Sequence, residues 1–272
     1  MLRIDLFFFF LCLFIIYASA GAPPHSNKGA KLPVNCKSFY VDFTKARGTD
    51  VLTEENDARY SYTKEGLVLH LTPPKKYAPA KNEEGPYNKF VGGGPTFKSK
   101  FMLQYGSVEI TLKTAEPGGA VTAFILMAPN GDEIDYEWVG GRPLEAQTNF
   151  FSKGVPLYNV NSGKHRVEGI PVHDGFHRYK IVRTPQYIAW YIDEKLIRVT
   201  TREETCKKKK SGVEKRGKDE CSFPEQPAFL QFGLWDGSDS PGTAEWANGP
   251  IRWDKAGGIQ AVVKDVSLTC YA

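Results

Sequence analysis

The residues best suited to chemistry lie in one short stretch, DEIDYEW, at positions 132–138. Glu133, Asp135 and Glu137 occupy alternate positions there, with apolar or aromatic residues between them. Because a β-strand sends alternate side chains to opposite faces, a strand here would carry three carboxyl groups in a row on one face. Acidic residues are depleted in strands and aligned like charges repel, so this pattern indicates a chemical role.

The spacing of the two glutamates suits a pair of catalytic carboxyl groups. At a rise of ~3.3 Å per residue, the Cα atoms of Glu133 and Glu137 lie roughly 13 Å apart along a strand. A glutamate side chain reaches roughly 3.5–4 Å, so two side chains that lean inward bring their carboxyl groups to about 5–6 Å. Glycosidases that retain configuration place these groups about 5–5.5 Å apart, and inverting enzymes about 6.5–9.5 Å. The spacing therefore permits a retaining pair without requiring one.

Asp135 adds a third charge between the two glutamates on the same face. Three neighbouring carboxylates repel one another when all are ionised. We therefore expect one of them to keep its proton near neutral pH, as a general acid must.

Two other interpretations of the acidic stretch compete with catalysis. A solvent-exposed polar strand face is common, but it usually mixes charges or uses Thr and Lys. A calcium site takes several carboxylate oxygens, but calcium loops need glycine-bearing turns between the ligands, and here Ile134 and Tyr136 intervene. We expect no metal and no cofactor.

The elements that must position these acids are predicted to be short strands separated by turn residues. In residues 106–114, for example, Val108, Ile110 and Leu112 alternate with polar residues. The other predicted strands cover residues 66–72, 120–128, 132–138, 145–151, 177–183, 187–193, 195–201, 228–235 and 260–270. Many strands and little helix indicate an all-β fold, a β-sandwich or jelly roll, whose concave face could hold a long ligand. We assign residues 36–272 to this single domain.

The flanks of the acidic stretch make a family resemblance specific. The E-x-D-x-E pattern resembles glycoside hydrolase family 16. DEIDYEWVGG, EAQTNFFSKG and FGLWDGSDSPGTAEWANGPIRW together resemble the fungal Crh (Congo-red-hypersensitive) cell-wall transglycosylases. Plant xyloglucan transglucosylases usually have Phe and Leu where this chain has Trp138 and Val139. The resemblance runs from about Phe39 to Leu268.

This resemblance implies a concanavalin-like jelly roll with a concave substrate cleft, and a role for each acid. Glu133 would be the nucleophile that forms a covalent glycosyl-enzyme. Glu137 would be the general acid and then the base, and Asp135 would orient Glu133. Since the Crh group moves chitin chains onto β-glucan, it also implies a retaining transglycosylase with chitin or β-glucan as donor and acceptor. A hydrolytic endo-β-glucanase or chitinase, and a non-catalytic carbohydrate-binding jelly roll, are the alternatives.

Sugar binding is expected from aromatic rings and amides near the acids. The family pattern in FGLW…PGTAEW implies Gln231, Trp235 and Thr243 as substrate-binding residues. Gln147, Asn149 and Trp246 are further candidates for the same role. In contrast, we expect Trp138 and Trp190 to be core residues.

The N-terminal residues predict export. Leu6–Tyr17 is an apolar run followed by Ala18-Ser19-Ala20, an A-x-A cleavage site, so residues 1–20 are interpreted as a signal peptide and residues 21–35 as a loose arm. No later segment is predicted to span a membrane or to direct an anchor. We expect a secreted protein, extracellular or in the cell wall, with a polysaccharide partner and as a monomer.

The cysteine count agrees with an exported chain. Cys12 leaves with the signal peptide, and four cysteines remain, which favours two disulfides. Three pairings are possible. We favour Cys206–Cys221, which closes a short loop, and Cys36–Cys270, which joins the two ends of the domain.

The charge of the chain is concentrated in one segment. Residues 207–220 hold seven basic and three acidic residues, a net charge of +4, which equals that of the whole chain. Because a nucleic-acid binder spreads basic charge over a surface of its fold, no nucleic-acid partner is expected. We interpret 207–220 as an inserted, solvated loop. Contact with an anionic wall polymer and processing at Lys215-Arg216 are alternatives.

Overall fold

The computed structural model describes residues 35–157, 160–206 and 221–271. The predicted signal peptide, nearly all of the predicted N-terminal arm and the basic segment 207–220 lie outside these residues. Their boundaries stay predictions.

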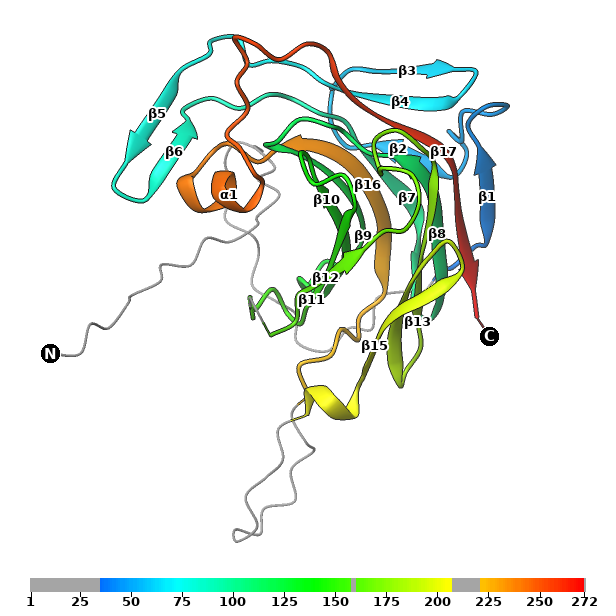
Figure 1. Cartoon of the computed structure of the whole chain (residues 1–272). Helices are drawn as coiled ribbons and strands as arrows, with labels where there is room; N and C mark the ends of the chain where they lie inside the picture. The colour runs from blue at the N-terminus through cyan, green and yellow to red at the C-terminus, as the bar shows by residue number, and fades with distance from the viewer. Residues whose placement is uncertain (1–34, 158–159, 207–220, 272) are drawn as a thin grey trace, which may run out of the picture.

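Two large antiparallel sheets form the protein, and they stack face to face (Figure 1). The outer sheet has eight strands in the order β15-β14-β13-β8-β17-β4-β3, with β1 also paired to β17. These strands are β1 (Phe39–Asp42), β3 (Tyr60–Thr63), β4 (Gly66–Leu71), β8 (Gly106–Lys113), β13 (His177–Arg183), β14 (Tyr187–Ile192), β15 (Lys195–Thr201) and β17 (Ile259–Cys270).

The inner sheet has seven strands in the order β12-β11-β10-β9-β16-β7-β2. These strands are β2 (Leu52–Glu54), β7 (Thr96–Leu103), β9 (Ala120–Met127), β10 (Glu133–Val139), β11 (Glu145–Phe151), β12 (Gly163–Arg166) and β16 (Ala228–Asp236). The inner sheet is curved, and its concave face is turned toward the short helix α1 (Pro241–Trp246) (Figure 1). A separate hairpin, β5 (Pro79–Asn82) and β6 (Gly85–Asn88), packs beside α1, and a 3₁₀ turn, η1 (Glu203–Thr205), follows β15.

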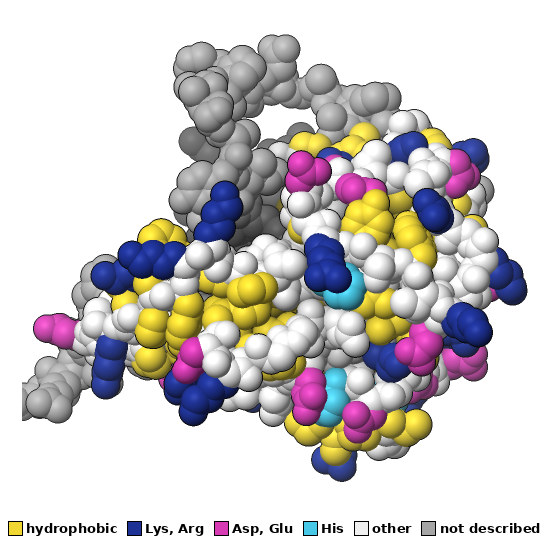
Figure 2. All heavy atoms as spheres, turned by 90° about the horizontal axis from the view of Figure 1, so that it is seen from above, with side chains coloured by type: hydrophobic (Ala, Val, Ile, Leu, Met, Phe, Trp, Pro, Cys, Tyr) yellow, Lys and Arg dark blue, Asp and Glu magenta, His cyan; other side chains and the backbone are white. Residues whose placement is uncertain are grey.

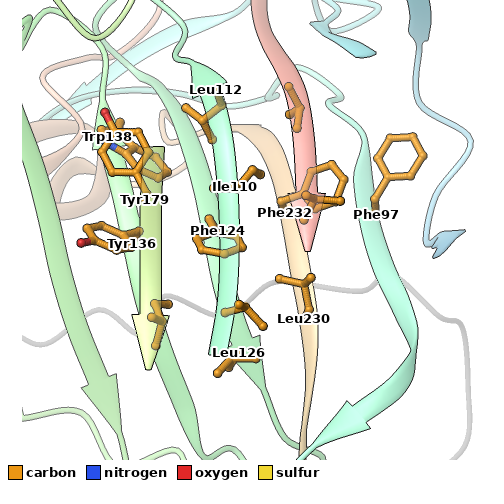
Figure 3. Packing of buried hydrophobic residues seen from close by; sticks show 14 of the residues in the cluster. Phe97, Ile110, Leu112, Phe124, Leu126, Tyr136, Trp138, Tyr179, Leu230 and Phe232 are labelled. Atoms are coloured by element: carbon orange, nitrogen blue, oxygen red, sulfur yellow. The ribbon is translucent and has the colours of Figure 1, made fainter. Parts of the chain in front are cut away.

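The core fills the space between the two sheets. In β8, Val108, Ile110 and Leu112 are fully buried while the residues between them are partly exposed, which is the alternation that predicted a strand. Figure 3 shows Ile110 and Leu112 among the aromatic side chains of the inner sheet, including Phe124 and Phe232. Burying a side chain of this size contributes roughly 1.5–3 kcal/mol to stability, so this layer fixes the inner sheet in place.

The all-β jelly-roll class is confirmed, and so are the predicted strands. The strands that the sequence did not reveal, such as β1, β5 and β12, are mostly three or four residues long and partly exposed, so they lack a readable period. The eight-residue strand β7 was also not among the predicted strands. Both favoured disulfides, Cys36–Cys270 and Cys206–Cys221, are present.

The described surface carries mixed charge. On the face seen in Figure 2, Lys and Arg side chains are interspersed with acidic and hydrophobic ones. No helix within the described ranges is long and apolar enough to cross a bilayer.

Candidate active site

Strand β10 separates acidic side chains from aromatic ones, as its alternation predicts. Tyr136 and Trp138 point into the core, where their rings stack with centroids 5.5 Å apart and meet Tyr179 of the outer sheet (Figure 3). The opposite face of β10, the concave one, therefore carries Glu133, Asp135 and Glu137. Asp135 is buried, and the two glutamates on either side of it are half-buried.

The start of β10 is held by Asp132, which the sequence had not singled out. Its carboxylate accepts backbone N–H bonds from Lys153 (2.8 Å), Glu225 (2.7 Å) and Gln226 (2.9 Å). Three such bonds satisfy a buried carboxyl group, which would otherwise lose the hydrogen bonds that water gives it. Asp132 thereby ties the residue before Glu133 to two loops.

The middle of β10 is fixed from the core side by the outer sheet. The indole N–H of Trp190 donates to the backbone oxygen of Asp135 at 3.1 Å, and the Tyr136 hydroxyl donates to the backbone oxygen of Tyr191 at 2.9 Å. Trp190 and Trp138 are both buried, which confirms their prediction as core residues. These bonds hold the backbone of β10 in place without using the carboxyl groups of its acidic residues.

The three acids share one electrostatic field. Burial raises the pKa of Glu133 to about 7, and a side-chain hydrogen bond with Asp135 opposes that rise. Burial and then the charge of Glu133 raise the pKa of Glu137 to about 8. The pKa of Asp135 is raised well above its usual range, first by burial and then by the charges of Glu133 and Glu137. Near neutral pH the cluster therefore keeps protons, and the charges of both neighbours add to burial in opposing the ionisation of Asp135.

Cations contribute little to this field. Within the described part of the chain, no Lys, Arg or His is among the groups that shift the pKa of Glu133, Asp135 or Glu137. The same residues include no group of three His, Cys, Asp or Glu side chains arranged to hold a metal ion. Protonation therefore relieves the repulsion within the cluster.

The neighbouring strands place amides beside the acids. In the register of β10 and β11, Gln147 is opposite Glu137 and Asn149 is opposite Asp135. Gln231 of β16 lies on the other side, two strands from Asp135, with Ile125 of β9 between them. Residues paired across antiparallel strands share a face, so these three predicted substrate-binding residues lie on the concave face with the acids.

Helix α1 places Trp246 against Trp235 of β16. The rings of Trp235 and Trp246 stack with centroids 5.9 Å apart, and the Trp246 indole N–H donates to Oε1 of Gln147 at 3.0 Å. Gln147 in turn donates to Glu145 at 2.9 Å. Thr243 lies on α1 one turn before Trp246, and its hydroxyl oxygen accepts a bond from Ser240. Trp246 is thus bonded to Gln147, the residue that pairs with Glu137 across the strands.

Comparisons with known proteins agree with this geometry. Residues 45–257 match the model of the glycosyl hydrolases family 16. The chain is 37% identical over 186 residues to Crh-like protein UTR2 of Candida albicans, covering 65% of this chain and 37% of that protein. It is 32% identical over 187 residues to Congo red hypersensitive protein 2 of Saccharomyces cerevisiae, covering 66% and 38%. The chain thus matches less than half the length of these relatives.

A solved structure shows the same fold. The structure of Crh5 transglycosylase in complex with NAG superposes with a TM-score of 0.70 at 24% sequence identity, covering 88% of this chain and 86% of that one. The two structures therefore share the same architecture over nearly the whole described chain.

Proposed function

The chain belongs to glycosyl hydrolase family 16, as a Crh-type member, and from that premise we propose that it is a retaining transglycosylase of cell-wall polysaccharide. The observation that carries the proposal is the set of three alternate acids on the concave face, two of which have their pKa raised to about 7 and about 8. A carbohydrate-binding module would gain nothing from burying three carboxyl groups side by side.

In the first step, the ionised Glu133 attacks the anomeric carbon of the donor sugar. The glycosidic bond breaks, and the leaving oxygen takes the proton of Glu137, which leaves a covalent glycosyl-enzyme on Glu133. The causes of the pKa shifts support this division of roles: the hydrogen bond with Asp135 lowers the pKa of Glu133, whereas the charge of Glu133 adds to burial in raising the pKa of Glu137.

In the second step, Glu137 acts as the base. It takes a proton from the incoming hydroxyl, whose oxygen attacks the anomeric carbon and releases Glu133. When the hydroxyl belongs to another sugar chain the reaction is a transfer, and when it belongs to water the reaction is hydrolysis. We propose transfer, with a chitin or β-glucan donor and a β-glucan or chitin acceptor, because the sequence is similar to those of Crh-type proteins.

Asp135 orients the nucleophile in this proposal, and the concave face binds the sugars. The rings of Trp235 and Trp246 offer flat apolar surfaces, and Gln147, Asn149 and Gln231 offer amides to the sugar hydroxyls. Thr243 adds a hydroxyl on the α1 side. The predicted export and the similarity to Crh-type proteins support action outside the cell, at the fungal cell wall.

The test combines a nucleophile variant with product analysis. Glu133→Gln should lower turnover of chitin and glucan oligomers by at least about 10³-fold while oligosaccharide binding persists. The matched control is Glu168→Gln, the same exchange at an exposed glutamate paired with Lys195, which should leave turnover unchanged. Surviving turnover in the Glu133 variant would remove it as nucleophile.

A labelled β-glucan acceptor then separates transfer from hydrolysis. Incubation of the unaltered enzyme with chitin oligomers and this acceptor should give larger, labelled hybrid products. Accumulation of reducing ends without hybrid products would identify a hydrolase instead.

A further inference from the structure

A second hollow lies on the opposite side of the sandwich, on the solvent face of the outer sheet. It has a volume of about 470 Å³ and includes the side chains of Tyr187, Tyr191 and Tyr271 in its lining. Ligand pockets typically measure about 300–1,000 Å³, so the hollow has the size of a small-ligand or oligomer site. We call it the outer hollow.

The register of the outer sheet explains how the hollow forms. Glu109 of β8 pairs with Lys180 of β13, and Lys180 pairs with Tyr191 of β14. Their neighbours along each strand, such as Ile181 and Trp190, are buried in the core, so these three side chains point away from it. The concave face with its acids belongs to the other sheet, about 10 Å away across the core.

The tyrosines of the outer hollow expose apolar surface without a partner segment in the described chain. Tyr187 is 37% exposed and Tyr271 is 47% exposed. A tyrosine ring has an apolar face and a hydroxyl that needs a polar partner, so it suits a ligand that has both apolar and hydroxyl surface. Pyranose sugars have this character, since their C–H groups form flat faces and their hydroxyls project at the edge.

The charged groups of the outer hollow balance one another. Arg178 lies 3.6 Å from Glu109 and 3.0 Å from Glu194, and Lys180 lies 3.8 Å from Glu109. Two cations and two anions leave no net charge, so the hollow favours neither an anionic nor a cationic ligand. These side chains still have free donor and acceptor capacity, because Arg offers five N–H groups and Lys three.

The composition of the outer hollow disfavours a protein partner. The cores of protein interfaces are depleted of charged residues, and a stable interface buries about 800 Å² on each partner. Here four charged groups lie among the tyrosines in a hollow of limited size. A neutral, hydroxyl-rich ligand satisfies both kinds of group at once.

We propose that the outer hollow is a second glycan-binding site, which takes a segment of a neutral polysaccharide chain and holds the enzyme on the polymer. The choice of glycan as ligand rests on the proposed function. Because the two sites lie on opposite faces, the segment bound in the outer hollow does not reach the acids. It raises the local concentration of polymer at the concave face, which matters for an insoluble substrate and not for a short soluble one.

The test measures binding of the full chain to particulate chitin and particulate β-glucan, in the Glu133→Gln background so that the polymer is not consumed. The double substitution Tyr187→Ala and Tyr271→Ala should weaken binding to at least one polymer about tenfold, from two lost ring contacts. Tyr40→Ala is the matched control, because Tyr40 is a 66% exposed tyrosine of β1 in the same sheet that does not line the hollow.

A second measurement shows whether the tyrosines act through the fold. In the chain with Glu133 intact, the double variant should turn over soluble oligosaccharides within about twofold of the parent rate. The proposal would be overturned if the double variant bound polymer as tightly as the Tyr40→Ala control, or if the parent chain itself did not bind polymer. It would also be overturned if the double variant lost soluble turnover to the same extent as polymer binding. A chain that binds polymer through these tyrosines but never cleaves it would keep this inference and refute the proposed function.

Discussion

Asp135 provides the sharpest test of how the acidic cluster works. Its raised pKa keeps it protonated near neutral pH, so its O–H donates to the Glu133 carboxylate and favours the ionised nucleophile. Asp135→Ala removes the donor, whereas Asp135→Asn keeps a donor of nearly the same shape. The two variants therefore separate loss of the hydrogen bond from loss of the acid.

The expected shift follows from the strength of one hydrogen bond to a charged group. Such a bond contributes about 1.5–3 kcal/mol, and one pKa unit corresponds to about 1.4 kcal/mol, so the pKa of Glu133 should rise by about 1–2 units in Asp135→Ala. It would then move from about 7 toward or past the value of about 8 that Glu137 has. The form with Glu133 ionised and Glu137 protonated would become scarce at every pH.

The assay is the pH profile of kcat/KM, which reports the groups of the free enzyme. The unaltered enzyme should give a bell with its acid limb near 7 and its alkaline limb near 8. In Asp135→Ala the acid limb should move up and activity at pH 6 should fall about tenfold to a hundredfold, while in Asp135→Asn the limb stays within about half a unit. An unmoved limb in Asp135→Ala, or equal shifts in both variants, would refute the assignment of Asp135 as donor.

The remaining predictions concern stability and substrate binding. Glu137→Gln should be inactive yet more stable than the parent by about 1–3 kcal/mol at pH 8, measured by urea unfolding. The folded-state pKa of Glu137 is raised from 4.5 to about 8, so the stability that the protonated side chain contributes is fully present below pH 4.5 and is lost as the pH rises from 4.5 to about 8. If the stability advantage of Glu137→Gln over the parent does not grow from pH 5 to pH 8, this reasoning is wrong. Asp132→Ala should cost about 3 kcal/mol because three backbone N–H groups lose their acceptor, with Asp132→Asn intermediate in the same unfolding assay; a cost under about 1 kcal/mol would show that β10 does not depend on Asp132. Trp246→Phe keeps a ring but loses the N–H that holds Gln147, so KM for oligosaccharides should rise about twofold to fivefold, and more in Trp246→Ala; a KM in Trp246→Phe equal to that of the parent would exclude a role for that bond.

Strands with a clear period could be predicted from the sequence, because alternation records which face is buried. β8 and β10 were predicted for this reason, and the direction of the Trp138 side chain followed from its position directly after Glu137 in the alternation. β5 and β12 could not be predicted, because short exposed strands bury too few side chains to leave an alternating pattern in the sequence. Among the described strands, β5 pairs only with the next strand, β6, and β12 pairs with the preceding strand, β11.

The acids of the candidate site could be found from sequence, but what holds them could not. Spacing alone places Glu133, Asp135 and Glu137 on one face. Asp132, just before β10, accepts bonds from backbone N–H groups up to 94 residues away, and Trp190 donates to β10 from 55 residues away, so no local pattern encodes these bonds. Asp132 could have been suspected only because it adjoins the acidic pattern.

The Cys36–Cys270 disulfide has a mechanical consequence. It joins residues 234 positions apart, and β1 pairs with β17 directly beside it. A pulling force applied to the chain outside these two cysteines runs through the sulfur bridge and bypasses both sheets. In the oxidised protein the sandwich would carry no tension, whereas reduction would expose it to load and allow roughly 800 Å of chain to extend. A wall under turgor is a stretched material, and a protein closed in this way could be tethered in it at both ends without being unfolded by it.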